Sequence, residues 1–95
     1  MIMRIPEIKN PNDWNEVEKL LTTLMRSFPE FRSDYSKFVK NIDIKISELA
    51  KIDIHLRRQP ESIEFNRNRR HKLREINNAI RMFSKMHLLA SLSKR

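Results

Sequence analysis

The chain has 95 residues, no Cys and no Gly, and 20 Lys or Arg against 12 Asp or Glu, a formal net charge of +8. This length allows one domain with a modest core. The lack of Gly argues against tight β-hairpins, a P-loop and a dinucleotide fold. The lack of Cys excludes disulfides and favours a reducing compartment. The positive charge favours an anionic partner, namely nucleic acid, an acidic protein or a membrane surface.

The N-terminal sequence MIMRIPEIKN contains no apolar run of signal-peptide length. No stretch approaches the ~20 apolar residues that a membrane span needs. We therefore expect a soluble, cytoplasmic protein that folds as a single helical domain over residues 1–95. Pro6 and the Asn10-Pro11 pair interrupt the start of the chain. Because a proline pushes the preceding residue towards extended backbone, we expect residues 1–11 to form an extended arm.

The first helical pattern covers about residues 13–28. Apolar residues follow i, i+3, i+4, i+7 spacing, which predicts an amphipathic helix; they are Trp14, Val17, Leu20, Leu21, Leu24, Met25 and Phe28. Asp13 followed by Glu16 resembles a capping box, and Pro29 is expected to end the helix. We interpret Trp14 as a core anchor, with an interface role as the alternative.

A second helix is predicted at about residues 31–58. Its apolar seam repeats every seven residues, which suits packing along an antiparallel partner helix; the repeating residues are Tyr35, Ile42, Leu49 and Leu56. Ile44 and Ile54 lie off this seam. Three interpretations remain for them: isolated surface residues, docking points for the first helix, or part of a dimer face.

A third helix is predicted at about residues 60–92, with Pro60 in its first turn. Its apolar face is formed by Phe65, Leu73, Ile76, Ala79, Ile80, Phe83, Met86, Leu89 and Ala90. Met25, Met82 and Met86 are expected to fill the core. Arg69 interrupts the apolar face, so we expect the helix to be irregular near residues 66–70.

These elements predict an all-α fold. The second and third helices would form a long antiparallel hairpin, and the first would cover its groove to complete a three-helix bundle. On this register Arg69 faces Asp53, and a buried Arg must be paired. The sequence therefore predicts a structural ion pair between them. The alternative is that the bundle opens here and Arg69 joins a binding surface.

The stretch from Arg57 to Arg74 holds seven Lys or Arg and two Glu, a net charge of +5. Cations continue along one face of the third helix at successive offsets of 3, 4, 7 and 4, which keep them together; we call Arg67, Arg70, Arg74, Arg81 and Lys85 the outer cations. His71 and Asn78 lie beside them. Asn66, Asn68 and Asn77 could add further donors towards sugar, phosphate or base edges.

The outer cations, with His71 and Asn78, predict a surface for a phosphate backbone, because an Arg guanidinium can bind two oxygens at once. We expect a non-enzymatic accessory or regulatory protein that binds DNA or RNA. An ordinary solvated helix face is the plain alternative. A functional alternative is a helical adaptor, chaperone or inhibitor that binds an acidic protein, through the same face or through the apolar side of the first helix. The small core makes a homodimer a further candidate.

No enzymatic or metal chemistry is predicted, and no cofactor is expected. His55, His71 and His87 are each sixteen residues apart, without the i, i+3 or i, i+4 spacing of a helical metal site. No Ser–His–acid or paired-carboxylate arrangement can be argued from the spacing of the remaining residues.

Overall fold

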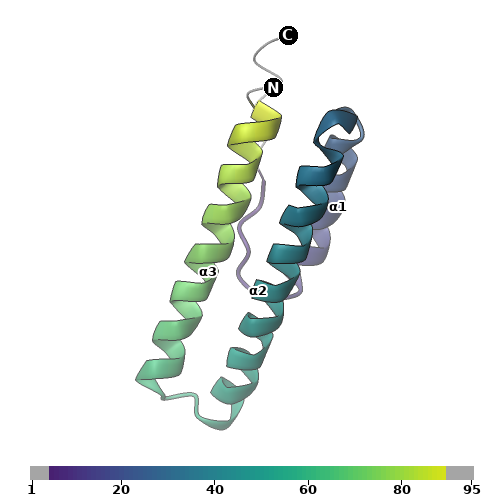
Figure 1. The fold of residues 1–95 in the computed structure, drawn as a ribbon. Coiled ribbons are helices and arrows are strands. Elements are labelled where there is room, and N and C mark those ends of the chain that lie inside the picture. Colours follow the sequence, from purple (N-terminus) through teal and green to yellow (C-terminus); the bar gives the residue numbers. More distant parts are fainter. Residues whose placement is uncertain (1–4, 90–95) are drawn as a thin grey trace.

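The computed structural model describes residues 5–89. It contains three α-helices, α1 (Asp13–Met25), α2 (Arg32–Arg58) and α3 (Ile63–Phe83) (Figure 1). A 3-10 turn, η1 (Pro29–Phe31), joins α1 to α2, and a π-helical segment, η2 (Ser84–Leu89), continues α3. Residues 5–89 contain no strand. The expected all-α bundle built on a helical hairpin is therefore confirmed.

The helices form an elongated body of 50 × 23 × 17 Å. α2 and α3 run antiparallel, and α1 lies beside only the N-terminal part of α2, next to η1 (Figure 1). The 13 residues of α1 extend about 20 Å at 1.5 Å per residue, whereas the 27 residues of α2 extend about 40 Å. Among residues 5–89, no third helix therefore lies beside the part of the hairpin near its tip.

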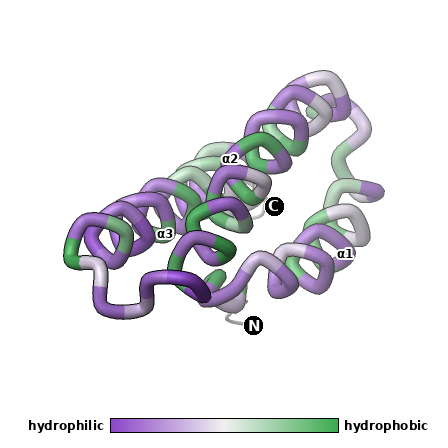
Figure 2. Tube along the Cα trace, turned by 90° about the horizontal axis from the view of Figure 1, so that it is seen from below, coloured by the Kyte–Doolittle hydropathy of each residue, from purple (hydrophilic) through white to green (hydrophobic). Residues whose placement is uncertain are grey.

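The apolar core lies where the three helices and the N-terminal arm meet. The buried apolar residues are Ile8, Trp14, Val17, Leu21, Met25, Phe28, Ile42, Leu49, Ile76, Ile80 and Phe83. None of them lies between residues 50 and 75. We call residues 50–75 the tip half and the rest of the described chain the core half. In Figure 2 the tip of the hairpin is mostly coloured hydrophilic.

Two helix ends differ from the expected ones. α1 ends at Met25 rather than at residue 28, because Phe28, which precedes Pro29, leaves helical geometry with φ −133° and ψ 65°. α3 begins at Ile63 rather than at residue 60. Ser62 has extended backbone, and its Oγ accepts a hydrogen bond from Phe65 N at 3.2 Å. This Ser cap, rather than the proline, sets the start of the helix.

The expected irregularity near residues 66–70 is absent, since α3 is continuous from Ile63 to Phe83. The helix widens instead at η2, which begins at the buried Ser84. Ser84 Oγ donates to Ile80 O at 2.8 Å, and such a bond competes with the backbone N–H for the carbonyl. The expected helix end at residue 92 lies outside the described residues.

The apolar residues off the main seam are exposed. Ile44 is 62 % exposed and Ile54 is 50 % exposed. Met82 and Met86 are also exposed, so the expectation that they fill the core is wrong, whereas Met25 is buried. Met82 lies on the side of α3 that turns away from Ile76 and Ile80. Met86 belongs to η2, where the α-helical spacing used for the expectation no longer holds.

Candidate nucleic-acid interface

We call the side of α3 that carries the outer cations the outer face. It faces solvent because the opposite side of the helix packs into the core. Ile76 is fully buried, and Ile80 and Phe83 are at most 7 % exposed. Residues on the other side of a 3.6-residue period must then face solvent. All seven residues predicted to bind nucleic acid are exposed: Arg67, Arg70, His71, Arg74, Asn78, Arg81 and Lys85.

These residues follow a nearly straight line. α3 is an unbroken α-helix through Arg67 and Arg81, and Lys85 follows in the first turn of η2. At 1.5 Å per residue, the 18 steps from Arg67 to Lys85 cover about 27 Å. The outer cations therefore form one row along α3 and the start of η2.

The outer cations have few carboxylate partners within the described chain. Arg81 is the exception, because its Nη2 lies 3.8 Å from Glu7 Oε1. Both side chains in this pair are about two-thirds exposed, so the contact is worth little. Arg81 Nη1 also donates to Asn78 Oδ1 at 3.4 Å. Among residues 5–89, the other four outer cations lie within 4 Å of no carboxylate oxygen.

The cations on the inner side of the hairpin are paired. Lys72 Nζ lies 3.4 Å from Glu48 Oε2 and 3.5 Å from Glu75 Oε2. Lys45 Nζ also donates to Glu75 Oε1. The hydrogen bond from Lys45 lowers the pKa of the Glu75 carboxyl, against the smaller opposing effect of burial. Glu75 thus neutralises charges inside the hairpin and is not directed towards the outer cations.

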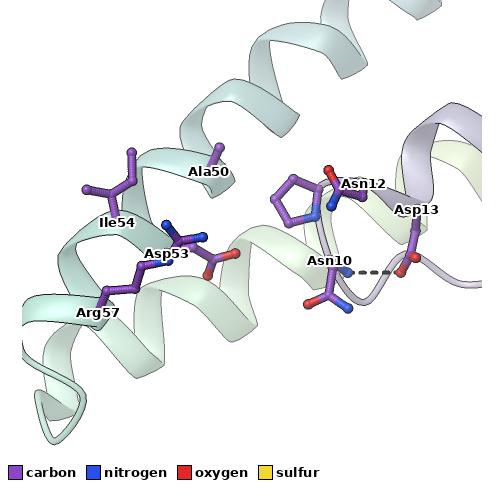
Figure 3. A pocket seen from close by; sticks show the side chains of 8 residues that line it. Asn10, Asn12, Asp13, Ala50, Asp53, Ile54 and Arg57 are labelled. Atoms are coloured by element: carbon purple, nitrogen blue, oxygen red, sulfur yellow. Dashed lines mark hydrogen bonds between the residues drawn. The ribbon is translucent and has the colours of Figure 1, made fainter.

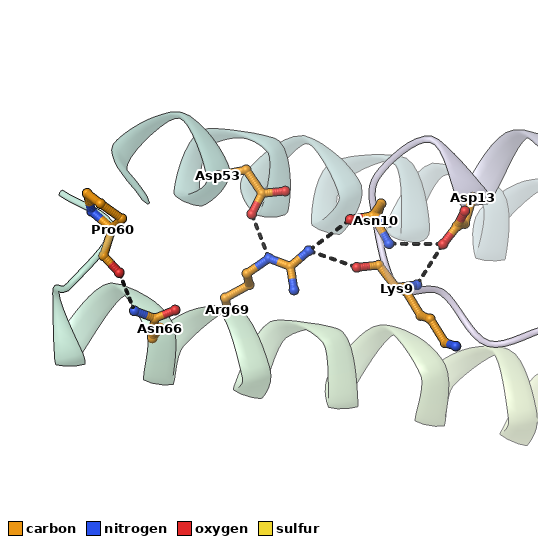
Figure 4. A network of polar contacts seen from close by, with 7 residues as sticks. All are labelled: Lys9, Asn10, Asp13, Asp53, Pro60, Asn66 and Arg69. Atoms are coloured by element: carbon orange, nitrogen blue, oxygen red, sulfur yellow. Dashed lines mark hydrogen bonds and ion pairs between the residues drawn. The ribbon is translucent and has the colours of Figure 1, made fainter. Parts of the chain in front are cut away.

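Arg69 joins three segments of the chain (Figure 4). Its Nε donates to Asp53 Oδ1 at 2.6 Å, which is the contact expected from the sequence. Its Nη2 donates to Lys9 O at 2.8 Å and to Asn10 Oδ1 at 3.2 Å. Arg69 therefore ties α3 to α2 and to the arm, and it is not part of the outer face.

The arm is fastened further by α1. Asp13 Oδ2 accepts hydrogen bonds from Lys9 N at 2.8 Å and from Asn10 N at 3.0 Å. These two bonds lower the pKa of the Asp13 carboxyl. Asp13 is the first residue of α1, and Asn12 at the cap position makes no side-chain hydrogen bond. Instead of forming the expected capping box with Glu16, Asp13 therefore accepts hydrogen bonds from the loop that precedes α1.

Asn77 has a role that the sequence did not reveal. Its Oδ1 accepts from Ile8 N at 2.7 Å, and its Nδ2 donates to Ile8 O at 3.0 Å. Asn66 is likewise engaged, because its Nδ2 donates to Pro60 O and Ser62 O. Both residues were expected to be donors for nucleic acid, and both are instead used by the fold. An Asn within a predicted helix gives no sequence signal that separates these two uses.

The aromatic residues pack inside the molecule rather than on the outer face. Phe38 and Phe83 stack with their ring centroids 4.3 Å apart, and Trp14 meets Phe38 edge to face at 6.3 Å. Trp14 is 3 % exposed, and its Nε1 donates to Asp43 Oδ1 at 2.8 Å. Within the described part of α3, no Phe, Tyr or Trp accompanies the outer cations.

A shallow pocket lies where the arm meets α1 and α2 (Figure 3). It is lined by Asn10, Pro11, Asn12, Asp13, Ala50, Asp53, Ile54 and Arg57. Its two carboxylates are both engaged, Asp53 by Arg69 and Asp13 by backbone N–H groups. Over residues 5–89, no cluster of His, Asp or Glu is placed to hold a metal ion. The same residues contain no helix with the length and apolarity that crossing a bilayer requires.

Comparisons with known proteins add no relative. A scan against protein-family models found no match, and neither a search of curated proteins nor a search of solved structures found one.

Proposed function

We propose that this protein is a non-enzymatic accessory or regulatory protein that binds the phosphate backbone of a nucleic-acid duplex along the outer face of α3. The outer cations would be the positioning contacts, with His71 and Asn78 as neighbouring donors. Contacts of this kind fix the protein on the duplex without reading its sequence.

The observation that carries the proposal is the separation of paired and unpaired cations on one helix. Arg69 and Lys72, which face the hairpin, have carboxylate partners. The row from Arg67 to Lys85 has only the weak contact of Arg81 with Glu7 among the described residues. Like charges one turn apart repel by a few tenths of a kcal/mol per pair. A polyanion would relieve that repulsion and release its counterions.

A duplex is favoured over a single strand by what the outer face lacks. Proteins that bind single strands without sequence preference stack the bases on aromatic side chains, each worth about 1–3 kcal/mol. The aromatic residues discussed above are in the interior. A straight row of guanidinium groups without a stacking platform suits a ligand whose bases are already stacked and whose phosphates are outside.

The test measures affinity for labelled 20-base-pair DNA and RNA duplexes, and for the single strands, by fluorescence anisotropy across a salt series. If all five outer cations neutralise phosphates, log K falls with log salt at a slope of roughly −4.5 on duplex DNA. Changing Arg67, Arg70 and Arg74 together to Glu should abolish measurable binding and flatten the slope. Single strands should bind less tightly than either duplex.

A matched control keeps the total charge change the same. Arg26, Lys37 and Lys40 are exposed and lie outside α3, so changing these three to Glu also lowers the net charge by six. This variant should keep most of the duplex affinity. If both triple variants lose affinity equally, binding reflects net charge alone and the proposed site is wrong. A flat salt response of the unmodified protein would exclude a phosphate-backbone mode altogether.

A further inference from the structure

The side of α2 that packs on α1 continues into the tip half, where no helix of the described chain (residues 5–89) lies beside it. In the core half this side carries Asp43, which accepts from Trp14 Nε1. One to four turns further along, at offsets of 4, 7, 11 and 14, the same side carries Ser47, Ala50, Ile54 and Arg57. Ile54 is 50 % exposed, and it lines the pocket below the first turn of α1 together with Ala50 and Arg57. We call residues 47–58 of α2 the open strip.

The open strip has the make-up of a helix-docking surface. Ser47 and Ala50 are small and allow a second helix to approach closely. Ile54 supplies an apolar contact, and the pocket beside it ends against residues 10–13 (Figure 3). The strip is about 18 Å long at 1.5 Å per residue, which matches three to four turns of a partner helix.

The charge around the open strip defines the occupant. Lys51, Arg57 and Arg58 are exposed, and among residues 5–89 none of them has a carboxylate oxygen within 4 Å. The two acids within residues 47–58 are already engaged, because Asp53 accepts from Arg69 and Glu48 pairs with Lys72. A second copy of this chain would place these cations against themselves, which costs free energy. A helix with an apolar stripe and acidic flanks would complement the strip instead.

We propose that the open strip binds a short, acidic, amphipathic helix of a partner protein, in line with α1. The bound helix would act as a fourth helix beside the uncovered half of α2, in the helix-in-groove mode. Its apolar stripe would cover Ile54 and Ala50, and its carboxylates would meet Lys51, Arg57 and Arg58. This surface is separate from the outer face of α3, so the inference does not depend on nucleic-acid binding.

The probe is a fluorescein-labelled 14-residue helical peptide with Leu at i, i+3, i+4 and i+7 and Glu at its flanking positions. Its counterpart has the same Leu residues and Lys in place of Glu. The Glu peptide should bind saturably and at least about tenfold more tightly than the Lys peptide, a difference of about 1.4 kcal/mol. Amide resonances that shift on binding should cluster at residues 10–13 and 47–58.

Variants separate this surface from its rivals. Ile54→Asp should weaken peptide binding about tenfold or more, because it places a charge opposite the apolar stripe. Arg57→Glu with Arg58→Glu should do the same. Ile44→Asp is the matched control, since Ile44 is also exposed on α2 but lies outside the strip, and it should change affinity less than about twofold.

Four outcomes would overturn the inference. The first three are equal binding of the Glu and Lys peptides, equal effects of Ile54→Asp and Ile44→Asp, and the absence of saturable binding. Changing Arg67, Arg70 and Arg74 to Glu should leave peptide binding in place. If instead Arg57→Glu with Arg58→Glu abolishes duplex binding and leaves the peptide bound, the tip cations belong to the phosphate surface and the inference is wrong.

Discussion

The two halves of the molecule are held together by different forces. The core half contains all eleven buried apolar side chains, drawn from the arm, the three helices and the loop before η1. The tip half contains none. Its two helices are joined by the ion pair of Arg69 with Asp53 and by the stacking of His55 on Phe65 at 5.0 Å, and Lys72 pairs with Glu48 just beyond the boundary.

This difference teaches where specificity and stability come from in a small helical chain. Apolar burial scales with the area removed from water, so the core half carries most of the folding free energy. Partly exposed ion pairs add little free energy but define which residues face each other. The tip half is therefore aligned rather than strongly stabilised, and local opening should begin there.

The largest effect is expected in the core half. Ile76→Ala removes a fully buried side chain at the contact of α3 with α2 and should lower the free energy of unfolding by about 3 kcal/mol. Urea unfolding monitored by circular dichroism measures this loss. Ile44→Ala, at a position that is 62 % exposed, should stay within about 0.5 kcal/mol of the original chain. Similar losses at both positions would contradict the assigned core.

A smaller effect is expected at the junction of the two halves. Arg69→Ala removes hydrogen bonds to Asp53, Lys9 and Asn10 and should cost about 2 kcal/mol. Hydrogen exchange should then speed up in the tip half and in residues 8–10 before it does so at Leu21. A double-mutant cycle with Asp53→Ala should give an interaction free energy between the two residues of at least about 0.5 kcal/mol. Additive effects would mean that the two residues act independently.

The arm offers a third comparison. Asn77→Ala removes both hydrogen bonds to the backbone of Ile8 and should cost about 1–2 kcal/mol, because the Ile8 N–H and C=O would lose their partners. Asn78→Ala is the matched control one residue along, on the exposed face, and should cost less than about 0.5 kcal/mol. Proteolysis within the arm should become faster only in the Asn77 variant.

The smallest effect concerns acid. The pKa of Glu75 is lowered in the folded protein, so its contribution to stability is present above the unfolded-state pKa and is lost as pH falls through the folded-state pKa. At pH 6, Glu75→Gln should therefore lower the free energy of unfolding. The loss should be less than about 1 kcal/mol, because solvent screens the ion pair of Glu75 with Lys45. The gap should narrow below about pH 4. A gap independent of pH would contradict this origin.

Much of the fold could be predicted because repeated apolar spacing is a strong signal. The hairpin, the core position of Trp14 and the facing of Arg69 with Asp53 all follow from helical periods. The start of α3 was placed too early because Pro60 and Ser62 both carry helix-start signals, and only the backbone geometry of Ser62 decides between them. Met82 was misplaced because it was assigned to the core by residue type, although helical spacing turns it away from Ile80.

The exposure of the cations in the candidate site could be predicted, but the hydrogen bonds of the Asn residues near them could not. The exposure of Arg67, Arg70 and Arg74 follows from the burial of the opposite face. The removal of Asn66 and Asn77 from the donor set could not be foreseen, because it depends on where the turn and the arm pass α3. The same holds for the open strip, which exists because α1 stops short of the tip.

The bond pair between Asn77 and Ile8 has a consequence for how the N-terminal segment can evolve. The Asn77 amide donates to the carbonyl of Ile8 and accepts from its N–H. It therefore binds main-chain groups only, as a neighbouring β-strand does. Any residue except proline presents those two groups. The side chains on either side of Ile8 can therefore change in evolution while the segment keeps its position along the bundle. One of them is Glu7, the carboxylate that lies near Arg81.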